Sequence, residues 1–145
     1  MNSQLENAII DAEDIKKSVY KDSLGLYTIG IGFLCDEKMN AGLSVDECMM
    51  ILRSRIQNLK RQLSSYSWFQ KSDRPRQEAL IHLAYNMGIP RLLEFKNMLG
   101  YFDKKDYINA AKELLNSKWA TQVQKPRVDG LNYLIREGKY AARKG

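Results

Sequence analysis

Three polar side chains near the start of the chain could together carry acid–base chemistry: Glu13, Asp22 and Thr28. Glycosidic bonds are usually hydrolysed by two carboxyl groups. One protonates the leaving oxygen, and the other activates water or stabilises the sugar cation. A threonine hydroxyl can help to hold the water molecule. The types and order of these residues therefore indicate cleavage of a sugar polymer.

Sequence context separates Glu13 from the acids beside it. It follows Ile9 by four residues, which places it at the border of the apolar face of a predicted helix. Partial burial there raises the pKa of a carboxyl group and suits it to donate a proton near neutrality. Asp22 lies in a predicted polar turn and should stay ionised, so the two carboxyl groups divide into an acid and a base.

The elements that must position these residues are a short helix and a β-hairpin. Apolar residues recur at helical spacing over residues 3–13, and the period changes to two from residue 18 onward. The first expected strand ends at residue 20, and the second spans residues 26–33. A turn at 21–25 joins them. Thr28 shares a strand face with Gly30 and Gly32. That bare face would let a ligand approach the backbone, although a bulge or tight packing also explains such glycines.

The rest of the chain reads as helical. Residues 44–47, Ser-Val-Asp-Glu, form a capping box that opens a helix of nearly 20 residues, which at about 1.5 Å per residue is long enough to join two lobes. A loop is expected at 34–43 before it. Further helices are predicted at 76–87, 91–100, 105–117 and 127–143.

Composition bounds the classes of partner. The 145 residues carry a net charge of +6, from 23 basic and 17 acidic residues, which favours polyanionic partners unless the protein is merely basic. Basic residues are not densely interleaved with aromatic ones, so no nucleic-acid partner is expected. No apolar stretch approaches a membrane span, so no stable membrane insertion is expected. The polar N-terminus lacks the pattern of a secretory signal, which predicts synthesis in the cytoplasm.

Cysteine and histidine usage argues against a metal site or other cofactor. Cys35 and Cys48 are not spaced as a zinc cluster, and His82 is the single histidine. Two buried thiols fit a reducing compartment, with a disulfide formed after export as the alternative. His82 lies at the edge of an apolar helix face, where a packed or solvent-edge histidine is favoured over a catalytic one.

These motifs resemble those of T4-type phage lysozymes, which belong to glycoside hydrolase family 24. Glu13, Asp22 and Thr28 match the family's triad in order and separation, and the segments 20–22 and 27–32 match the flanking motif. The likeness continues over most of the chain, through Tyr-Asn-Met-Gly at 85–88, Phe-Lys-Asn at 95–97, Ser-Lys-Trp at 117–119, and Arg127.

The resemblance implies an α+β, mainly α, fold with a single lysozyme domain over residues 1–145. In that fold a small β-hairpin lobe, about 14–50, is joined by a long helix, about 44–64, to a helical lobe at about 65–145. The N-terminal helix is expected to pack on the helical lobe. The sugar polymer would bind in the cleft between the lobes.

The resemblance also implies hydrolysis of the β-1,4 bond between N-acetylmuramic acid and N-acetylglucosamine. Glu13 would be the general acid, and Asp22 with Thr28 would position the attacking water, with inversion at the anomeric carbon. Arg127 would pair with Glu13 and hold the geometry of the cleft. Substrate-binding positions are implied at Phe33, Leu34, Asn86 and Asn97.

The same likeness implies an endolysin, a monomer that lyses the bacterial wall to release phage. It would stay in the host cytoplasm until a separate holin permeabilises the membrane, and would then act on peptidoglycan in the periplasm.

The sequence departs from the family pattern in three places: Asp14 replaces a glycine beside the acid, Phe33 replaces a histidine, and the stretch 35–43 is short. A second negative charge close to Glu13 would raise its pKa further.

Two other classes of function compete with this reading. One is a wall-binding module without chemistry, but such a module has no need for Glu13, Asp22 and Thr28 together. The other is a cationic, membrane-disrupting protein, suggested by the basic segment 136–145. An interfacial helix needs a large apolar face, and this segment has few apolar residues, so it is expected to pack on its own lobe.

Overall fold

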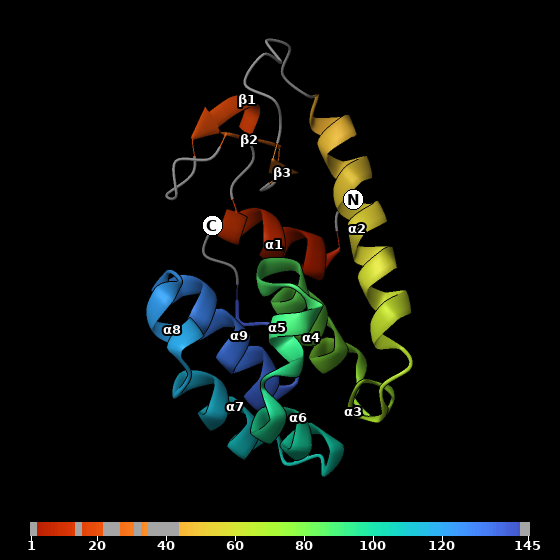
Figure 1. The fold of residues 1–145 in the computed structure, drawn as a ribbon, viewed down its shortest axis with the longest axis vertical. Helices are drawn as coiled ribbons and strands as arrows, with labels where there is room; N and C mark the ends of the chain where they lie inside the picture. Colours follow the sequence, from red (N-terminus) through yellow and green to blue (C-terminus); the bar gives the residue numbers. More distant parts are fainter. Residues whose placement is uncertain (1–2, 14–15, 22–26, 31–32, 35–43, 143–145) are drawn as a thin grey trace. The chain divides into compact units, whose positions relative to one another are not determined.

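The computed structural model describes residues 3–13, 16–21, 27–30, 33–34 and 44–142 (Figure 1), and for Glu13, Val45 and the strand residues it describes the backbone. This described part is mainly helical, with one small sheet, so the predicted mainly helical class is confirmed. The chain divides into two compact units, Met1–Gln57 and Asn58–Gly145, with the division inside helix α2. The predicted lobe boundaries and their arrangement around a cleft stay a prediction.

The first unit begins with helix α1, Gln4–Glu13, as the apolar spacing predicts. A capping box that the sequence reading missed starts it: the Glu6 amide donates to the Ser3 hydroxyl over 3.1 Å, and the Ser3 amide donates to the Glu6 carboxylate over 3.2 Å. Leu5 and Ile9 are buried. Arg53 of α2 forms an ion pair of 3.3 Å with Glu6, which ties the two helices together.

The sheet has three short antiparallel strands: β1 (Lys16–Lys21), β2 (Tyr27–Gly30) and β3 (Phe33–Leu34), in the order β1-β2-β3. The prediction of one continuous strand over residues 26–33 is wrong, because β2 and β3 pair antiparallel and the chain reverses between them. Glycine tolerates the backbone angles of tight turns. Gly30 is accordingly the last residue of β2, at a point where the alternating pattern was interpreted as a continuing strand.

Helix α2, Val45–Leu63, starts at the predicted capping box. The Glu47 amide donates to the Ser44 hydroxyl over 3.1 Å, and the Ser44 amide donates to the Glu47 carboxylate over 3.2 Å. Of its apolar residues at helical spacing, Cys48, Leu52, Ile56 and Leu63 are buried and Leu59 is half-buried. Cys35 lies outside the described residues, so the redox state of the two cysteines stays a prediction.

The second unit contains the helices that follow α2 (Figure 1): α3 (Ser67–Gln70), α4 (Arg74–Met87), α5 (Ile89–Leu93), α6 (Lys96–Asp103), α7 (Tyr107–Leu115), α8 (Lys118–Gln122) and α9 (Lys125–Glu137). Its core contains large, fully buried side chains from several of these helices: Leu83, Met98, Phe102, Leu114, Trp119 and Leu134.

Two features of this unit correct the sequence reading. The helix predicted at 91–100 is two helices, because α5 ends at Leu93, and Glu94 and Phe95 separate it from α6. The short helices α3 and α8 were not predicted. Four or five residues are too few to show a hydrophobic period, so only capping residues could have revealed them; Ser117, whose hydroxyl caps α8 through the Ala120 amide, is one such signal.

Candidate active site

The backbone places two of the three predicted catalytic residues. Glu13 is the last residue of α1, three positions before β1 begins. Thr28 lies in the central strand of the sheet, with Tyr20 of β1 and Leu34 of β3 as its Cα partners. Asp22 lies outside the described residues; it directly follows Lys21, whose Cα partner is Tyr27. The relation of the three side chains to one another stays a prediction.

Two residues predicted to line the sugar site form the third strand. Phe33 pairs with Ile29, and Leu34 pairs with Thr28. Cα partners on antiparallel strands lie about 4.5–5.5 Å apart, so the backbone of Leu34 adjoins that of Thr28. The pairing of β2 with β3 therefore brings together a predicted catalytic position and a predicted binding position that lie six positions apart in the chain.

Asn86, another predicted binding residue, has a structural partner in the second unit. It lies in the last turn of α4, and its side-chain oxygen accepts a hydrogen bond of 2.7 Å from the indole nitrogen of Trp119 in α8. Trp119 is buried. This bond fixes the orientation of both side chains and joins α4 to α8, an arrangement that the matched motifs at 85–88 and 117–119 did not by themselves reveal.

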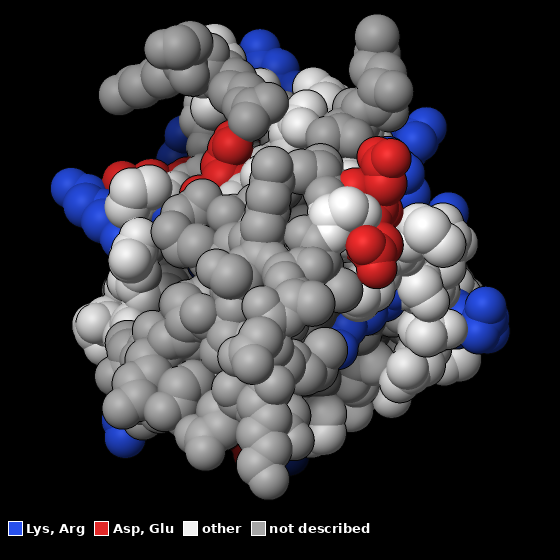
Figure 2. Space-filling model, turned by 90° about the horizontal axis from the view of Figure 1, so that it is seen from above, with Lys and Arg blue, Asp and Glu red and all other residues white. Residues whose placement is uncertain are grey.

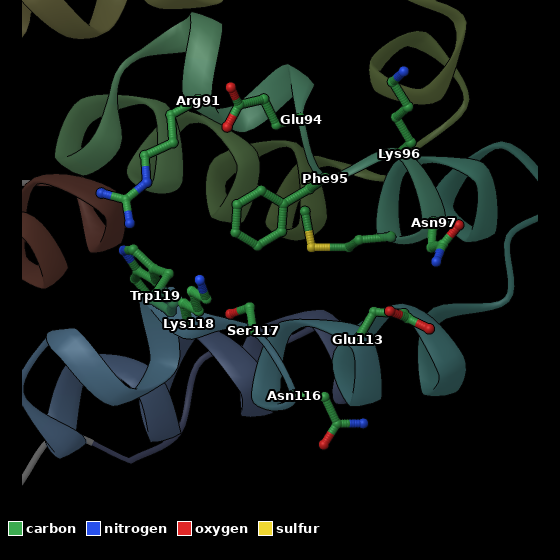
Figure 3. A pocket seen from close by; sticks show the side chains of 11 residues that line it. Arg91, Glu94, Phe95, Lys96, Asn97, Glu113, Asn116, Ser117, Lys118 and Trp119 are labelled. Carbon is green, nitrogen blue, oxygen red and sulfur yellow. The ribbon is translucent and has the colours of Figure 1, made fainter.

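Asn97, the fourth predicted binding residue, is exposed at the start of α6 and lines an open pocket of about 360 Å³ (Figure 3). One wall of this pocket comes from α5, α6 and the connection between them, and the other comes from α7 and α8. We call it the α5–α8 pocket. The sequence reading found Asn97 but missed the charged residues around it, because they come from four different short elements.

Arg127, the residue predicted to support Glu13, lies in the first turn of α9 and is half-buried. Its positive charge acts on His82 of α4, which is 4% exposed. Burial, and secondly the charge of Arg127, lower the pKa of His82 to about 3. Neither ring nitrogen of His82 has a hydrogen-bond partner within the described part of the chain. Of the two non-catalytic alternatives, a packed and a solvent-edge histidine, the burial of His82 confirms the packed one.

Charged side chains are spread over the face of the molecule that is seen from above. Figure 2 shows Lys and Arg side chains at separate positions, with Asp and Glu side chains among them. Among the described residues no group of His, Cys, Asp and Glu could hold a metal ion. None of the helices described here is long and apolar enough to cross a membrane.

A mainly helical chain with a glutamate at the end of its first helix and a threonine in the following sheet has the elements of a lysozyme-type hydrolase. Residues 11–136 match the family described as phage lysozyme, and the chain belongs to that family. It is similar to two proteins of Dictyostelium discoideum, named probable T4-type lysozyme 1 and probable T4-type lysozyme 2. The first is 29% identical over 149 residues, which cover 84% of this chain and 88% of the relative. The second is 30% identical over 156 residues, which cover 86% and 89%.

The chain is therefore a lysozyme-type muramidase, a glycoside hydrolase of a family that acts on peptidoglycan. The matched region includes Asp22, Thr28 and Arg127 as well as the residues of the α5–α8 pocket. The resemblance inferred from the N-terminal motif is confirmed at the level of the family.

Proposed function

We propose that this muramidase cleaves the β-1,4 bond between N-acetylmuramic acid and N-acetylglucosamine with inversion. Glu13 protonates the leaving oxygen, and Asp22 with Thr28 activates a water molecule on the opposite face of the sugar. Two carboxyl groups in unlike surroundings divide naturally into an acid and a base. In this scheme Glu13 must stay protonated until it reacts, while Asp22 must stay ionised.

The observation that carries this proposal is the match of Glu13, Asp22 and Thr28 to the triad of a family to which the chain belongs. The backbone supports it, because α1 ends at Glu13 and the strand register sets Tyr20 beside Thr28, two positions before Asp22. A short sheet after a helix end can present a carboxyl group and a hydroxyl group without any metal or cofactor.

The test is the replacement of Glu13 by glutamine, which keeps the size of the side chain but cannot donate the proton. We expect Glu13→Gln to fold normally and to lose nearly all activity, since general acid catalysis alone contributes about 10²–10⁴-fold. The measurement is turbidity loss of purified Gram-negative peptidoglycan, followed by analysis of the new sugar ends. Asp11→Asn is the matched control, because it removes an exposed carboxylate from the same helix.

Two outcomes would contradict the assignment, and a third would contradict only the inverting mechanism. Wall lysis by Glu13→Gln at close to the wild-type rate would remove Glu13 from the role of acid. New ends that are not muramic acid would show that a different bond is cut. Retention of anomeric configuration in the product would leave the bond and the acid in place but reject the inverting mechanism.

We propose further that the protein acts as a monomeric endolysin during phage release. Both relatives come from Dictyostelium discoideum, so this role rests on the sequence likeness to phage enzymes. In this setting a separate holin would open the membrane before the enzyme could reach the wall in the periplasm. Expression in a Gram-negative host should be tolerated until a permeabilising agent is added; lysis without that agent would reject the dependence. Light scattering would test the monomer.

A further inference from the structure

Helix α7 presents two large apolar side chains to solvent. Ile108 is 59% exposed and Leu115 is 47% exposed. Together with Lys112 they are spaced i, i+4 and i+7, so the three side chains share one face of the helix. The opposite face carries the buried side chains of the helix: Ala110, Ala111 and Leu114. Because α7 packs against α6 and α9 (Figure 1), the face with the two apolar side chains is the one turned to solvent.

Lysine residues surround these apolar side chains. Lys112 lies between Ile108 and Leu115, and Lys104 and Lys105 occupy the connection from α6 to α7. All three lysines are exposed. None of them belongs to an ion pair within the part of the chain that the structure describes. We call Lys104, Lys105, Ile108, Lys112 and Leu115 the α7 face.

The acidic residues near the α7 face have other partners. Asp103 accepts a hydrogen bond of 2.7 Å from the Ser67 hydroxyl group. Asp106 caps α7, because its carboxylate accepts from the backbone and side-chain amides of Asn109 over 3.3 Å and 2.7 Å. Glu113 is half-buried and lines the α5–α8 pocket. The α7 face is therefore a positive surface with two apolar side chains in it.

This mixture of charge and apolar groups decides which kind of partner fits. The core of a protein–protein interface is depleted of lysine, whereas Lys112 lies between the two apolar side chains of the α7 face. A second copy of the chain, docked by the same face, would bring like charges together. The surface of an anionic bilayer accepts both groups, because ammonium groups stay among the lipid phosphates while apolar side chains enter the boundary of the acyl chains.

We propose that the α7 face attaches the protein reversibly to the surface of an anionic lipid bilayer. Each lysine near such a surface strengthens binding about fivefold. Two apolar side chains are too few to bury a helix in the bilayer, so the attachment is shallow and leaves the bilayer intact. In the proposed endolysin setting, it would concentrate the enzyme at the membrane that separates it from the wall. The attachment itself does not depend on that setting.

Sedimentation with lipid vesicles measures the attachment. The probes are vesicles of phosphatidylcholine mixed with phosphatidylglycerol and vesicles of phosphatidylcholine alone. We expect wild type to bind the phosphatidylglycerol vesicles at least about tenfold more tightly. Ile108→Ser/Leu115→Ser should weaken this binding about tenfold, although the net charge stays at +6. Met50→Ser is the matched control, because it removes a 69% exposed apolar side chain from α2, and it should bind like wild type.

A second pair of variants separates the α7 face from net charge. Lys104→Gln/Lys112→Gln should weaken binding to phosphatidylglycerol vesicles by about tenfold or more. Lys60→Gln/Lys139→Gln also lowers the net charge from +6 to +4, but it removes exposed lysines that lie outside the α7 face. This control should bind more tightly than Lys104→Gln/Lys112→Gln. Equal losses in the two double variants would show that the overall charge holds the protein, and would overturn the proposal.

Equal binding of wild type to the two kinds of vesicle, or unchanged binding by Ile108→Ser/Leu115→Ser, would also overturn it. Spin-labelled phosphatidylglycerol in nanodiscs supplies the location: it should attenuate the NMR amide signals of Ile108 and Leu115 more than that of Met50. The reverse order would place the contact elsewhere and reject the α7 face. Because the vesicles contain no peptidoglycan, success or failure of this attachment is distinguishable from success or failure of cleavage through Glu13.

Discussion

At the scale of the residue, His82 shows what an unpartnered buried base does to a small protein. A buried polar atom without a hydrogen bond loses the solvation that it had in water. The ring avoids a larger penalty by staying neutral, since burial and the charge of Arg127 lower its pKa to about 3, against 6.5 for an ordinary histidine. Between these two values the unfolded chain binds a proton that the folded chain does not.

His82 should therefore make folding sensitive to acid. Above about pH 6.5 this histidine takes nothing from the free energy of unfolding, because it is neutral in both the folded and the unfolded chain. As the pH drops from 6.5 toward 3, the free energy of unfolding falls by up to about 1.4 kcal/mol per pH unit from this residue alone. His82→Leu should remove this part of the pH dependence. Urea unfolding at pH 7 and pH 4 measures it: the variant should lose less free energy of unfolding between these pH values than wild type.

Because the chain has a single histidine, its NMR signal provides an independent check. The ring proton of folded wild type should not titrate between pH 8 and pH 4.5. A midpoint near 6.5 in the folded protein would contradict the burial of the neutral ring. Parallel losses of stability in wild type and His82→Leu would show that other groups, not this histidine, set the acid sensitivity.

Arg127 is also a residue with a predicted catalytic partner, since it is expected to support Glu13. Arg127→Met should reduce wall lysis less than Glu13→Gln does, because it disturbs the position of the acid without removing it. The same change should raise the pKa of His82, whose depression the arginine charge increases. An unchanged rate together with an unchanged melting temperature would reject the support role, and the histidine signal would still report the local charge.

At the scale of the element, the end of α9 depends on one arginine from α4. Arg76 donates through Nε to the Ile135 carbonyl over 2.6 Å and through Nη2 to the Arg136 carbonyl over 3.0 Å. These carbonyls lie in the last turn of the helix, where intrahelical partners are lacking. The guanidinium also lies 3.9 Å from the centre of the Tyr107 ring in α7, so it joins three helices.

Loss of the Arg76 contacts should destabilise the folded protein. Arg76→Ala is expected to lower the free energy of unfolding by about 2–4 kcal/mol, because two charge-assisted bonds to the helix end, an ion pair with Asp73 and a cation–π contact disappear together. Arg74→Ala is the matched control: its side chain is 86% exposed and its ion pair with Glu78 should contribute less than about 1 kcal/mol. Urea unfolding compares them. Equal effects of the two changes would contradict the role of Arg76.

The glycine that follows α9 belongs to the same arrangement. Gly138 ends the helix with φ of +71°, and a Cβ atom there would lie 2.8 Å from Arg76 Nη1. The sequence could suggest the end of the helix from this glycine, since glycine is common just past a helix. The sequence could not indicate that an arginine 62 positions earlier would occupy the space beside this glycine. The predicted helix at 127–143 is therefore too long, because α9 ends before Gly138.

The same limit separates what could be predicted at the site from what could not. Local patterns reveal α1, the capping box of α2 and the candidate acid at Glu13, because each depends on residues within one or two turns. The reversal between β2 and β3 was missed because alternation looks the same on both sides of a turn. Asn86 and Trp119, 33 positions apart, meet only through the packing of α4 and α8.

For the molecule as a whole, 23 basic and 17 acidic residues sum to a net charge of +6, and on the face that Figure 2 shows the Lys and Arg side chains lie at separate positions. A dispersed excess of this kind acts through the summed field, which raises the rate of encounter with a polyanion without specifying where it binds. An anionic bacterial wall is such a polyanion. Exposed charges are screened over a Debye length of about 10 Å at 0.1 M salt and about 3 Å at 1 M.

Wall lysis should therefore slow as salt concentration rises, while cleavage of a short, soluble glycan fragment, which carries few charges, should change less. The double variant Lys60→Gln/Lys112→Gln removes two exposed lysines and lowers the net charge from +6 to +4. Its initial rate of turbidity loss at low salt should be below that of wild type, and the two rates should converge near 1 M salt. Because Lys60 and Lys112 lie outside the predicted active site and the α5–α8 pocket, a difference that persists at high salt would point to altered folding. If the rate of wall lysis changes neither with salt concentration nor between wild type and the double variant, the basic excess has no part in lysis. The enzyme would then find its substrate through contacts at the site itself.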